Sequence, residues 1–329
     1  MYIGTQHISG DNWNAYKVLP QLGVNHVSSN PPGDWQDWDA DVLSQFKEKL
    51  ASLDISLDMM ILPLASGPAR TQGAPHVFLG PSPERDRELD QICDLLRNMA
   101  RAGIPAGRYN ITILGHLRTE RRFGRGGASL SSFEYHKLDQ TLGEFEEGPA
   151  DADEMWERID YFLSRVVPVA EEYKVRLACH PQDPSIGDRT YRGVARVMGT
   201  VEGFKKFIEM HESPYHGLNF CIGTMSESLE NPGQDIYDVI RYFGERKKLF
   251  NIHFRNIKGG LLDFVEVFPD EGDVNMLKAL RVLKEVDYPY MVMPDHVPGI
   301  TGENPGGVGF GYCFGYIHAL MQAINEPSS

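Results

Sequence analysis

The sequence has few positive charges. Its 32 lysines and arginines stand against 46 aspartates and glutamates, which gives a formal net charge of -14 over 329 residues. A field of this sign repels polyanions, so neither nucleic acid nor an anionic membrane surface is expected as a partner. The same field opposes an anionic small molecule, which would need locally placed arginines or a bound cation.

Long apolar runs are also missing, since no stretch approaches the roughly 18 residues of a membrane-spanning helix. The first residues, Met1-Tyr-Ile-Gly-Thr-Gln, contain no basic region followed by an apolar core, so we expect no secretory signal and a cytoplasmic location. The four cysteines lie far apart without a Cys-x-x-Cys pair, which argues against a zinc ribbon or a thioredoxin-type motif. Reduced thiols are the expectation.

Short β-rich runs alternate with helical patterns from end to end, which predicts a parallel sheet covered by helices. The length suits a (β/α)8 TIM barrel, a fold of roughly 200 to over 400 residues. No internal repeat or linker divides the chain, so we predict an α/β fold with a single TIM-barrel domain over residues 1–329. The expected strands lie near Tyr2 to Thr5, His26 to Ser29, Leu57 to Leu62, Gly107 to Ile111, Val175 to Cys179, Leu218 to Ile222, Phe250 to Phe254 and Tyr290 to Met293.

Apolar residues at three- and four-residue spacing predict helices between these strands. The segment from residue 9 to 38, rich in Pro, Gly, Asn and Trp, predicts a short or distorted first helix. Two long connections, from about residue 112 to 148 and from 184 to 198, predict long loops on the catalytic face of the barrel. The expected helices cover Asp39 to Leu53, Pro83 to Ala102, Asp153 to Tyr173, Thr200 to His211, Asp235 to Phe243, Asp273 to Val286 and Gly311 to Ala323.

Four side chains able to bind a metal fall at the ends of the last four strands. They are His180, Cys221, His253 and Asp295. Taken singly, a histidine at a strand end is usually a hydrogen-bonded structural residue, and a lone cysteine is usually a small buried hydrophobe. A barrel, however, places consecutive strand ends side by side, and imidazole, thiolate and carboxylate together suit a divalent transition metal. The four positions therefore predict a metal site.

Strand parity selects among neighbouring residues. Cys179 and His180 point to opposite sides, and we assign His180 to the barrel axis. Arg255 lies two residues after the histidine of the seventh strand and shares its side, where it could hold a substrate carboxylate. His296 adjoins the last metal candidate and is suited to proton transfer near neutral pH. In the arginine-rich loop from residue 118 to 125, Arg118 lies nearest the strand and is the candidate for anion binding, whereas a solvated charge run is the ordinary alternative.

These residues resemble the mannonate dehydratase family, metal-dependent sugar-acid lyases with a xylose-isomerase-like TIM barrel. The resemblance runs from about residue 84 to 322, and its order and spacing are more specific than any single motif. It comprises Glu84-Arg85-Asp86, Asn98 to Gly103, Arg118-Thr119, Trp156-x4-Tyr161-Phe-Leu-x4-Pro168, His180-Pro-x-Asp183-Pro, Phe220-Cys-x-Gly223, Gly244-x-Arg246, His253-x-Arg255, Gly272-Asp273-Val-x-Met276 and Pro294-Asp295-His296.

The resemblance implies that His180, Cys221, His253 and Asp295 bind Mn2+ or Fe2+. On general grounds the soft thiolate of Cys221 suits Zn2+ or Fe2+ better than Mn2+, so Zn2+ stays an alternative. The resemblance also implies dehydration of D-mannonate or a related aldonate to a 2-keto-3-deoxy sugar acid. The residues implied in this reaction are His296 and Arg255 as catalytic groups, and Arg118, Arg255, Asp183 and Tyr312 as substrate-binding groups, Tyr312 being the tyrosine nearest the position of the family's own.

The sequence departs from the family pattern at four positions: Gln182, Met293, Val297 and Gly311 stand where the family has an acid, an arginine, a glycine and, approximately, a tyrosine. Two further hypotheses therefore stand beside the dehydratase. The same barrel and metal could serve a sugar isomerase or epimerase, because enediolate chemistry at a metal serves both outcomes. A barrel that binds a sugar acid without turnover is the third. A small-molecule sugar acid is the expected partner, and self-association into a homo-oligomer stays open.

Overall fold

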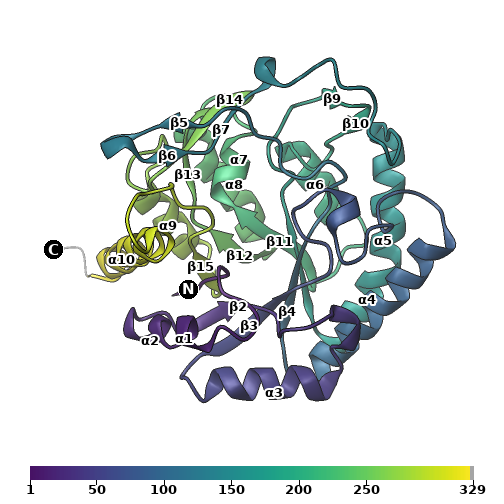
Figure 1. Cartoon of the computed structure of the whole chain (residues 1–329), viewed down its shortest axis with the longest axis horizontal. Coiled ribbons are helices and arrows are strands. Elements are labelled where there is room, and N and C mark those ends of the chain that lie inside the picture. The colour runs from purple at the N-terminus through teal and green to yellow at the C-terminus, as the bar shows by residue number, and fades with distance from the viewer. Residues whose placement is uncertain (327–329) are drawn as a thin grey trace.

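Eight parallel strands form the centre of the molecule in a computed structural model that describes residues 1–326 (Figure 1). Their order around the sheet is β1-β15-β12-β11-β8-β4-β3-β2. The two edge strands meet through a parallel bridge between Thr5 and Val27, which closes the barrel. The predicted TIM barrel is confirmed. Its strands are β1 Tyr2–Ile3, β2 His26–Ser28, β3 Ser56–Ile61, β4 Ala106–Asn110, β8 Arg176–His180, β11 His216–Cys221, β12 Leu249–His253 and β15 Met291–Met293.

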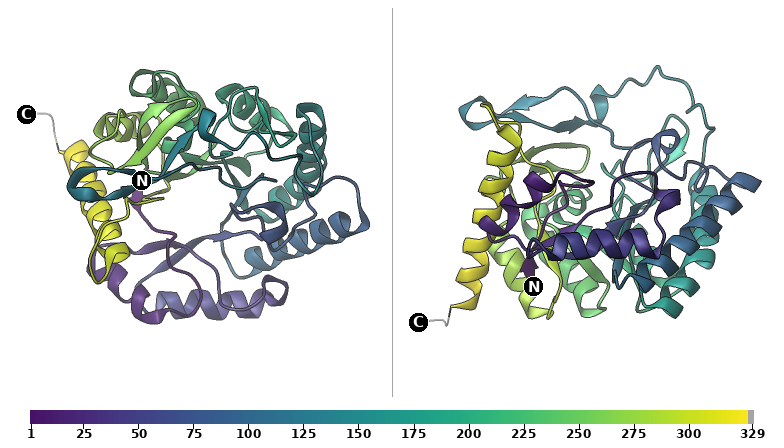
Figure 2. Two further views of the ribbon diagram at one scale, coloured as in Figure 1. Left: turned by 45° about the horizontal axis from the view of Figure 1, so that its top comes forward. Right: turned by 60° about the horizontal axis from the view of Figure 1, so that its bottom comes forward.

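Helices surround these strands as an outer ring, as Figure 1 and the two views of Figure 2 show. The first unit is irregular: two helices of four residues each take the place of a regular one, as the Pro- and Gly-rich segment predicts. None of the helices in residues 1–326 has the length and apolar character needed to cross a membrane. The helices are α1 Trp13–Tyr16, α2 Val18–Gln21, α3 Ala40–Ala51, α4 Pro83–Arg101, α5 Ala152–Tyr173, α6 Val201–Glu209, α7 Ile222–Ser226, α8 Pro232–Glu245, α9 Met276–Glu285 and α10 Pro305–Asn325, with 3-10 turns at Trp35–Asp37, Ala69–Thr71, Arg125–Gly127 and Tyr135–Lys137.

Local caps shift the starts of two helices from the sequence expectation, and one short helix was not predicted. Helix α10 begins at Pro305, six residues before the predicted start, since Asn304 accepts a hydrogen bond from the Gly307 amide and proline suits the first helical turn. Helix α9 begins after Asn275, which caps it. The sequence did not predict α7, a short helix that starts directly after the last residue of β11.

The long connections contain small sheets of their own. After β4, the strands β5 Arg122–Phe123 and β6 Ser129–Leu130 pair with each other, and β7 Ser132–Glu134 joins the hairpin β13 Asn256–Gly260 and β14 Asp263–Val267 in a sheet of order β13-β14-β7. After β8, β9 Thr190–Tyr191 pairs with β10 Val194–Ala195. The segments after β4 and β12 are thus joined by hydrogen bonds, and Glu266 of β14 contacts His296 after β15.

Helix α5 is the clearest case of core packing. Seven apolar residues at three- and four-residue spacing form a stripe along it, and all seven are buried. Within the stripe, the ring of Phe162 lies 5.2 Å from that of Phe78 and 5.2 Å from that of Tyr109 on β4. The stripe therefore fixes α5 against the strand whose end begins the first long loop. Its members are Met155, Ile159, Phe162, Leu163, Val166, Val167 and Ala170.

Replacing Phe162 by alanine should lower the free energy of unfolding by about 3 to 5 kcal/mol, because the surrounding rings cannot collapse into the space left behind. Urea denaturation of the purified variant measures this loss. The matched control is Glu157→Ala on the exposed side of the same helix, which should stay within about 0.5 kcal/mol of the parent. Equal effects of the two changes would contradict the packing described.

Candidate metal centre

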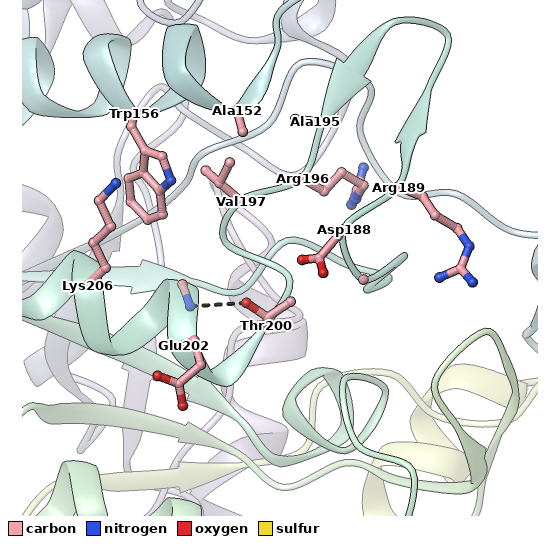
Figure 3. A pocket seen from close by; sticks show the side chains of 12 residues that line it. Ala152, Trp156, Asp188, Arg189, Ala195, Arg196, Val197, Thr200, Glu202 and Lys206 are labelled. Carbon is pink, nitrogen blue, oxygen red and sulfur yellow. Dashed lines mark hydrogen bonds between the residues drawn. The ribbon is translucent and has the colours of Figure 1, made fainter.

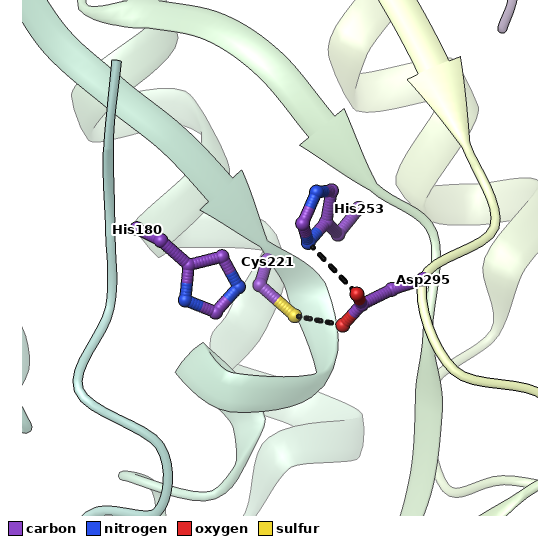
Figure 4. Close-up of side chains that lie close together, drawn as sticks. All are labelled: His180, Cys221, His253 and Asp295. Carbon is purple, nitrogen blue, oxygen red and sulfur yellow. Dashed lines mark hydrogen bonds and ion pairs between the residues drawn. The ribbon is translucent and has the colours of Figure 1, made fainter. Parts of the chain in front are cut away.

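Four side chains from four consecutive barrel strands converge at one point (Figure 4). His180, Cys221 and His253 are the last residues of β8, β11 and β12, and Asp295 follows β15 by two residues. One ligand atom from each of the four lies within 4.8 Å of those of the others. Parallel strands end at the same rim, so residues far apart in the chain meet here.

The imidazole of His180 is oriented by its own backbone. Its Nδ1 lies 2.7 Å from the carbonyl oxygen of Pro181 and donates to it, so Nε2 keeps a free lone pair. Burial lowers the pKa of His180 well below its ordinary value, which keeps the ring neutral. A neutral imidazole whose second nitrogen is fixed by a carbonyl is the usual arrangement of a metal-binding histidine.

Gln6 orients the opposite half of the cluster. Its amide nitrogen donates to Asp295 Oδ1 at 3.0 Å, and its oxygen faces His253 Nε2 at 2.9 Å, a nitrogen that also lies 3.1 Å from the amide nitrogen of Asn219. His253 Nδ1 then faces Asp295 Oδ1 at 3.3 Å without a hydrogen-bond partner. A buried ring nitrogen without a partner beside a carboxylate oxygen is an arrangement that a cation bound to both atoms would satisfy. The donor set thus fits a divalent metal.

Cys221 completes the set. Its sulfur accepts a hydrogen bond from the Thr224 amide at 3.3 Å at the start of α7 and lies 3.7 Å from Asp295 Oδ2. Burial raises the pKa of the Cys221 thiol, with the Asp295 carboxylate acting in the same direction against Arg255. Metal coordination therefore has to displace the thiol proton.

A cavity of about 170 Å³ opens beside the cluster. His180, His253 and Asp295 line it together with His296, which the sequence nominates for proton transfer. It also contains residues that sequence reasoning did not select. These are Gln6, His7, Ser66, Arg108, Asn110 and His116.

His296 is held by a carboxylate from the loop sheet, the three-stranded sheet of β13, β14 and β7. Its Nδ1 donates to Glu266 Oε2 at 2.9 Å, and the Glu266 carboxylate reaches the site from β14. Burial works against protonation of His296, but the carboxylates of Asp295 and Glu266 outweigh it and raise its pKa to about 9. The ring is therefore an imidazolium at neutral pH, with 37% of its side chain exposed toward the cavity side.

Arg255 and Arg118 lie next to this cavity but do not line it. Arg255 donates to Asp183 at 2.9 Å, to Glu227 at 2.7 Å and to Glu266 at 3.1 Å. Arg118 pairs with Asp183 at 2.5 Å and with Glu266 at 2.5 Å. All three acids are buried. The structure brings these arginines together as an internal ion-pair network, and their contact with substrate stays a prediction.

The charges of this network balance. Burial, aided by the Asp183 carboxylate, raises the pKa of Glu227 to about 8, so this acid is neutral near pH 7. The neighbouring arginines, by contrast, hold the pKa of Asp183 well below its ordinary value despite burial. Two guanidinium groups therefore face two carboxylates, those of Asp183 and Glu266, and the network keeps no surplus positive charge for a ligand.

The remaining sequence candidates lie away from the cavity. Tyr312 is 40% exposed on α10, where its ring packs edge-on against Phe268 at 5.7 Å and lies under Arg125. Phe310, its neighbour by two residues, stacks instead on His7, whose ring centroid is 3.9 Å away. The aromatic that approaches the cavity rim from α10 is thus Phe310.

A second hollow of about 300 Å³ lies between α5, the β9–β10 hairpin and the start of α6 (Figure 3). Two of its cationic groups already have partners. Arg196 donates to the backbone oxygens of Pro184, Gly115 and Asp183, and the Lys206 ammonium lies 4.2 Å from the centre of the Trp156 ring. We therefore place the chemistry at the smaller cavity beside the metal candidates.

A parallel barrel with candidate metal ligands at its strand ends is an arrangement found in metal-dependent TIM-barrel enzymes. A family model described as D-mannonate dehydratase (UxuA) matches residues 125–328. The chain belongs to this family, which confirms the resemblance and makes the protein a hydro-lyase by descent.

Relatives and solved structures agree with this assignment. Mannonate dehydratase of Thermotoga petrophila is 28% identical over 283 residues, covering 74% of this chain and 77% of that protein. The enzyme of Streptococcus agalactiae is 27% identical over 323 residues, with 88% of each chain covered. The crystal structure of mannonate dehydratase from Streptococcus suis serotype 2 shares the fold with a TM-score of 0.81 at 21% identity, covering 100% of this chain and 96% of that one.

Replacing Arg255 by methionine should destabilise the protein by about 3 to 5 kcal/mol, because it leaves buried carboxylates without their cation. Thermal and urea unfolding measure the loss. The matched control is Arg241→Met, an arginine paired with Asp238 and Glu285 on the outside of α8, which should cost below about 1 kcal/mol. A stability of Arg255→Met equal to that of the control would contradict the structural role.

Proposed function

We propose that this protein is a metal-dependent dehydratase that converts D-mannonate or a related aldonate into a 2-keto-3-deoxy sugar acid. The observation that supports it most is the joint position of the His180, Cys221, His253 and Asp295 cluster and of His296 around one cavity, in a member of this family. A small sugar acid as partner and a cytoplasmic location fit the same proposal.

In this proposal the four clustered side chains would hold Mn2+ or Fe2+. The two neutral imidazoles and the carboxylate suit either ion, whereas the softer thiolate of Cys221 favours Fe2+ over Mn2+ and leaves Zn2+ as the alternative. When bound, a divalent cation would supply electrostatic stabilisation of negative charge on substrate oxygens.

Two histidines of the cavity supply the acid and the base of the reaction: His296 is the acid and His116 is the base. His296 and His116 both line the cavity, and their ring centroids are 5.9 Å apart in an edge-on arrangement. The hydrogen bond to Glu266 holds the proton on His296. Within residues 1–326, no carboxylate forms a hydrogen bond or an ion pair with His116. Burial lowers the pKa of His116 to about 4; the Asp183 carboxylate opposes this shift, and the nearby cations Arg118 and His296 add to it.

Dehydration then needs two proton transfers. His116 takes the proton from C2, next to the substrate carboxylate, and the electron pair of that bond forms the C2–C3 double bond. His296 gives its proton to the C3 hydroxyl, which leaves as water. The resulting enol tautomerises to the 2-keto-3-deoxy acid. Environments that push two histidines toward opposite protonation states are the general way to obtain an acid and a base from one residue type.

Protein purified without oxygen and loaded separately with Fe2+, Mn2+ or Zn2+ should release a 2-keto-3-deoxy acid from D-mannonate, with Fe2+ or Mn2+ giving the higher rate. A panel of aldonates differing at C2 and C3 identifies the substrate, and product is measured by its 2-keto group and by mass. Elemental analysis of the protein as purified gives the native metal.

Two outcomes would overturn this proposal. Formation of a ketose or an epimer without loss of water would assign the protein to the isomerases or epimerases. Binding of aldonates with no turnover under any metal, and unchanged affinity in Asp295→Ala, would make it a binding protein.

Replacing His296 or His116 by glutamine should each lower kcat by about 10²- to 10⁴-fold, the usual contribution of a positioned acid or base. The two variants should differ in hydrogen exchange. In D2O, His116→Gln should fail to exchange the C2 hydrogen of substrate, whereas His296→Gln should still exchange it without releasing product.

The control for both variants is His136→Gln, a histidine with 72% of its side chain exposed in the loop after β4, which should keep the parent rate. Metal content of each variant is measured in parallel, so that loss of activity through loss of metal is recognised. C2 exchange that persists in His116→Gln would assign the base to another group.

A further inference from the structure

Arg108 differs from the other arginines around the site. It lies in the middle of β4, in register with Ala178 of β8 and Ile61 of β3, and its side chain lines the cavity beside the metal candidates. Alternation along β4 places it on the same barrel face as Asn110, two residues closer to the strand end. Its long side chain therefore reaches the cavity from the layer below.

The guanidinium of Arg108 has no fixed partner. Its Nε is buried without a hydrogen bond, and in the part of the chain that the structure describes no side-chain hydrogen bond or ion pair involves it. Burial lowers its pKa to about 10 against the opposing effect of Asp295, so the group stays charged at neutral pH. A buried charge without a partner is costly, and a ligand of opposite charge is the ordinary reason for keeping one.

Within residues 1–326, Arg108 is the only arginine or lysine that lines this cavity. Arg118 and Arg255 are engaged by Asp183 and Glu266, as described above. A cationic fork that is free, partly exposed to the cavity and next to His253 and Asp295 has the geometry to accept a carboxylate through two parallel hydrogen bonds.

We propose that Arg108 is a substrate-binding residue that takes the carboxylate of the sugar acid, so that the site selects anionic aldonates over neutral sugars. This inference rests on the proposed function, because it names the group that recognises the substrate. It also places C2 of the substrate, which is bonded to that carboxylate, within the cavity that contains His116 and His296.

The test compares a carboxylate with its uncharged counterpart in protein loaded with metal. The probes are 3-deoxy-D-mannonate, which lacks the hydroxyl that leaves and cannot be dehydrated, and its primary amide. Calorimetric titration gives both affinities without turnover. The parent protein should bind the carboxylate more tightly, and Arg108→Met should lose about 10- to 100-fold in carboxylate affinity while the amide affinity stays within about threefold.

Arg108→Lys provides the graded control. It keeps the charge but loses the planar fork, so its carboxylate affinity should fall between those of the parent and Arg108→Met. Where Arg108→Met does not fold, Arg108→Gln serves in the same comparison, since it removes the charge and keeps a polar side chain. Metal content and thermal stability are measured for every variant.

The outcomes separate this inference from the proposed function. Unchanged preference for the carboxylate in Arg108→Met would overturn the carboxylate site. An equal loss of affinity for the acid and the amide would also overturn it, because it indicates a structural role. So would a loss of metal with the preference retained, because it indicates that Arg108 supports the metal. If the parent protein dehydrates no aldonate but Arg108→Met still loses carboxylate affinity selectively, the assigned reaction fails and the carboxylate site stands. If dehydration proceeds with an unchanged KM in Arg108→Met, the carboxylate site fails and the reaction stands.

Discussion

The guanidinium of Arg255 is the contact on which the rest of the site depends. It donates hydrogen bonds to three separate segments: Asp183 from the loop after β8, Glu227 after α7 and Glu266 from β14. All three acids are buried, and the two that are ionised, Asp183 and Glu266, need a cation nearby in a dry interior. Through this one group, the loop sheet that contains Glu266 is fixed against the barrel rim, and His296 receives its hydrogen-bond partner.

The convergence of the metal candidates could be predicted from sequence because it follows from local rules. Each of His180, Cys221 and His253 ends an apolar run, and consecutive parallel strands of a barrel end side by side. Parity also selects correctly between neighbours on β8: the side chain of His180 joins the cluster, whereas Cys179 packs in the core between sheet and helices. The barrel was predictable for the same reason, since strand and helix periodicities alternate without interruption.

The pairing of charges could not be predicted. Arg118 and Glu266 are 148 positions apart and meet only because β7 adds to the β13–β14 hairpin, a contact between two irregular connections that no periodicity announces. For this reason sequence reasoning treated Arg118 and Arg255 as free cations. Arg108 was missed for the opposite reason. It lies inside β4, and the sequence candidates were sought only at strand ends. A long side chain inside a strand can still reach the rim from the layer below.

The distribution of charge also explains how a strongly acidic protein can accept an acidic substrate. The net charge of -14 belongs mostly to the surface, where salt and water screen it over about 10 Å. Within the site, Asp183 and Glu266 neutralise the two arginines of the network, and a metal held by the Cys221 thiolate and the Asp295 carboxylate would itself be neutralised. The positive charge left at the cavity is then that of Arg108 and the protonated His296. Because these groups lie in a small cavity of low dielectric constant, their attraction for a carboxylate is much stronger there than the opposing field of the distant surface.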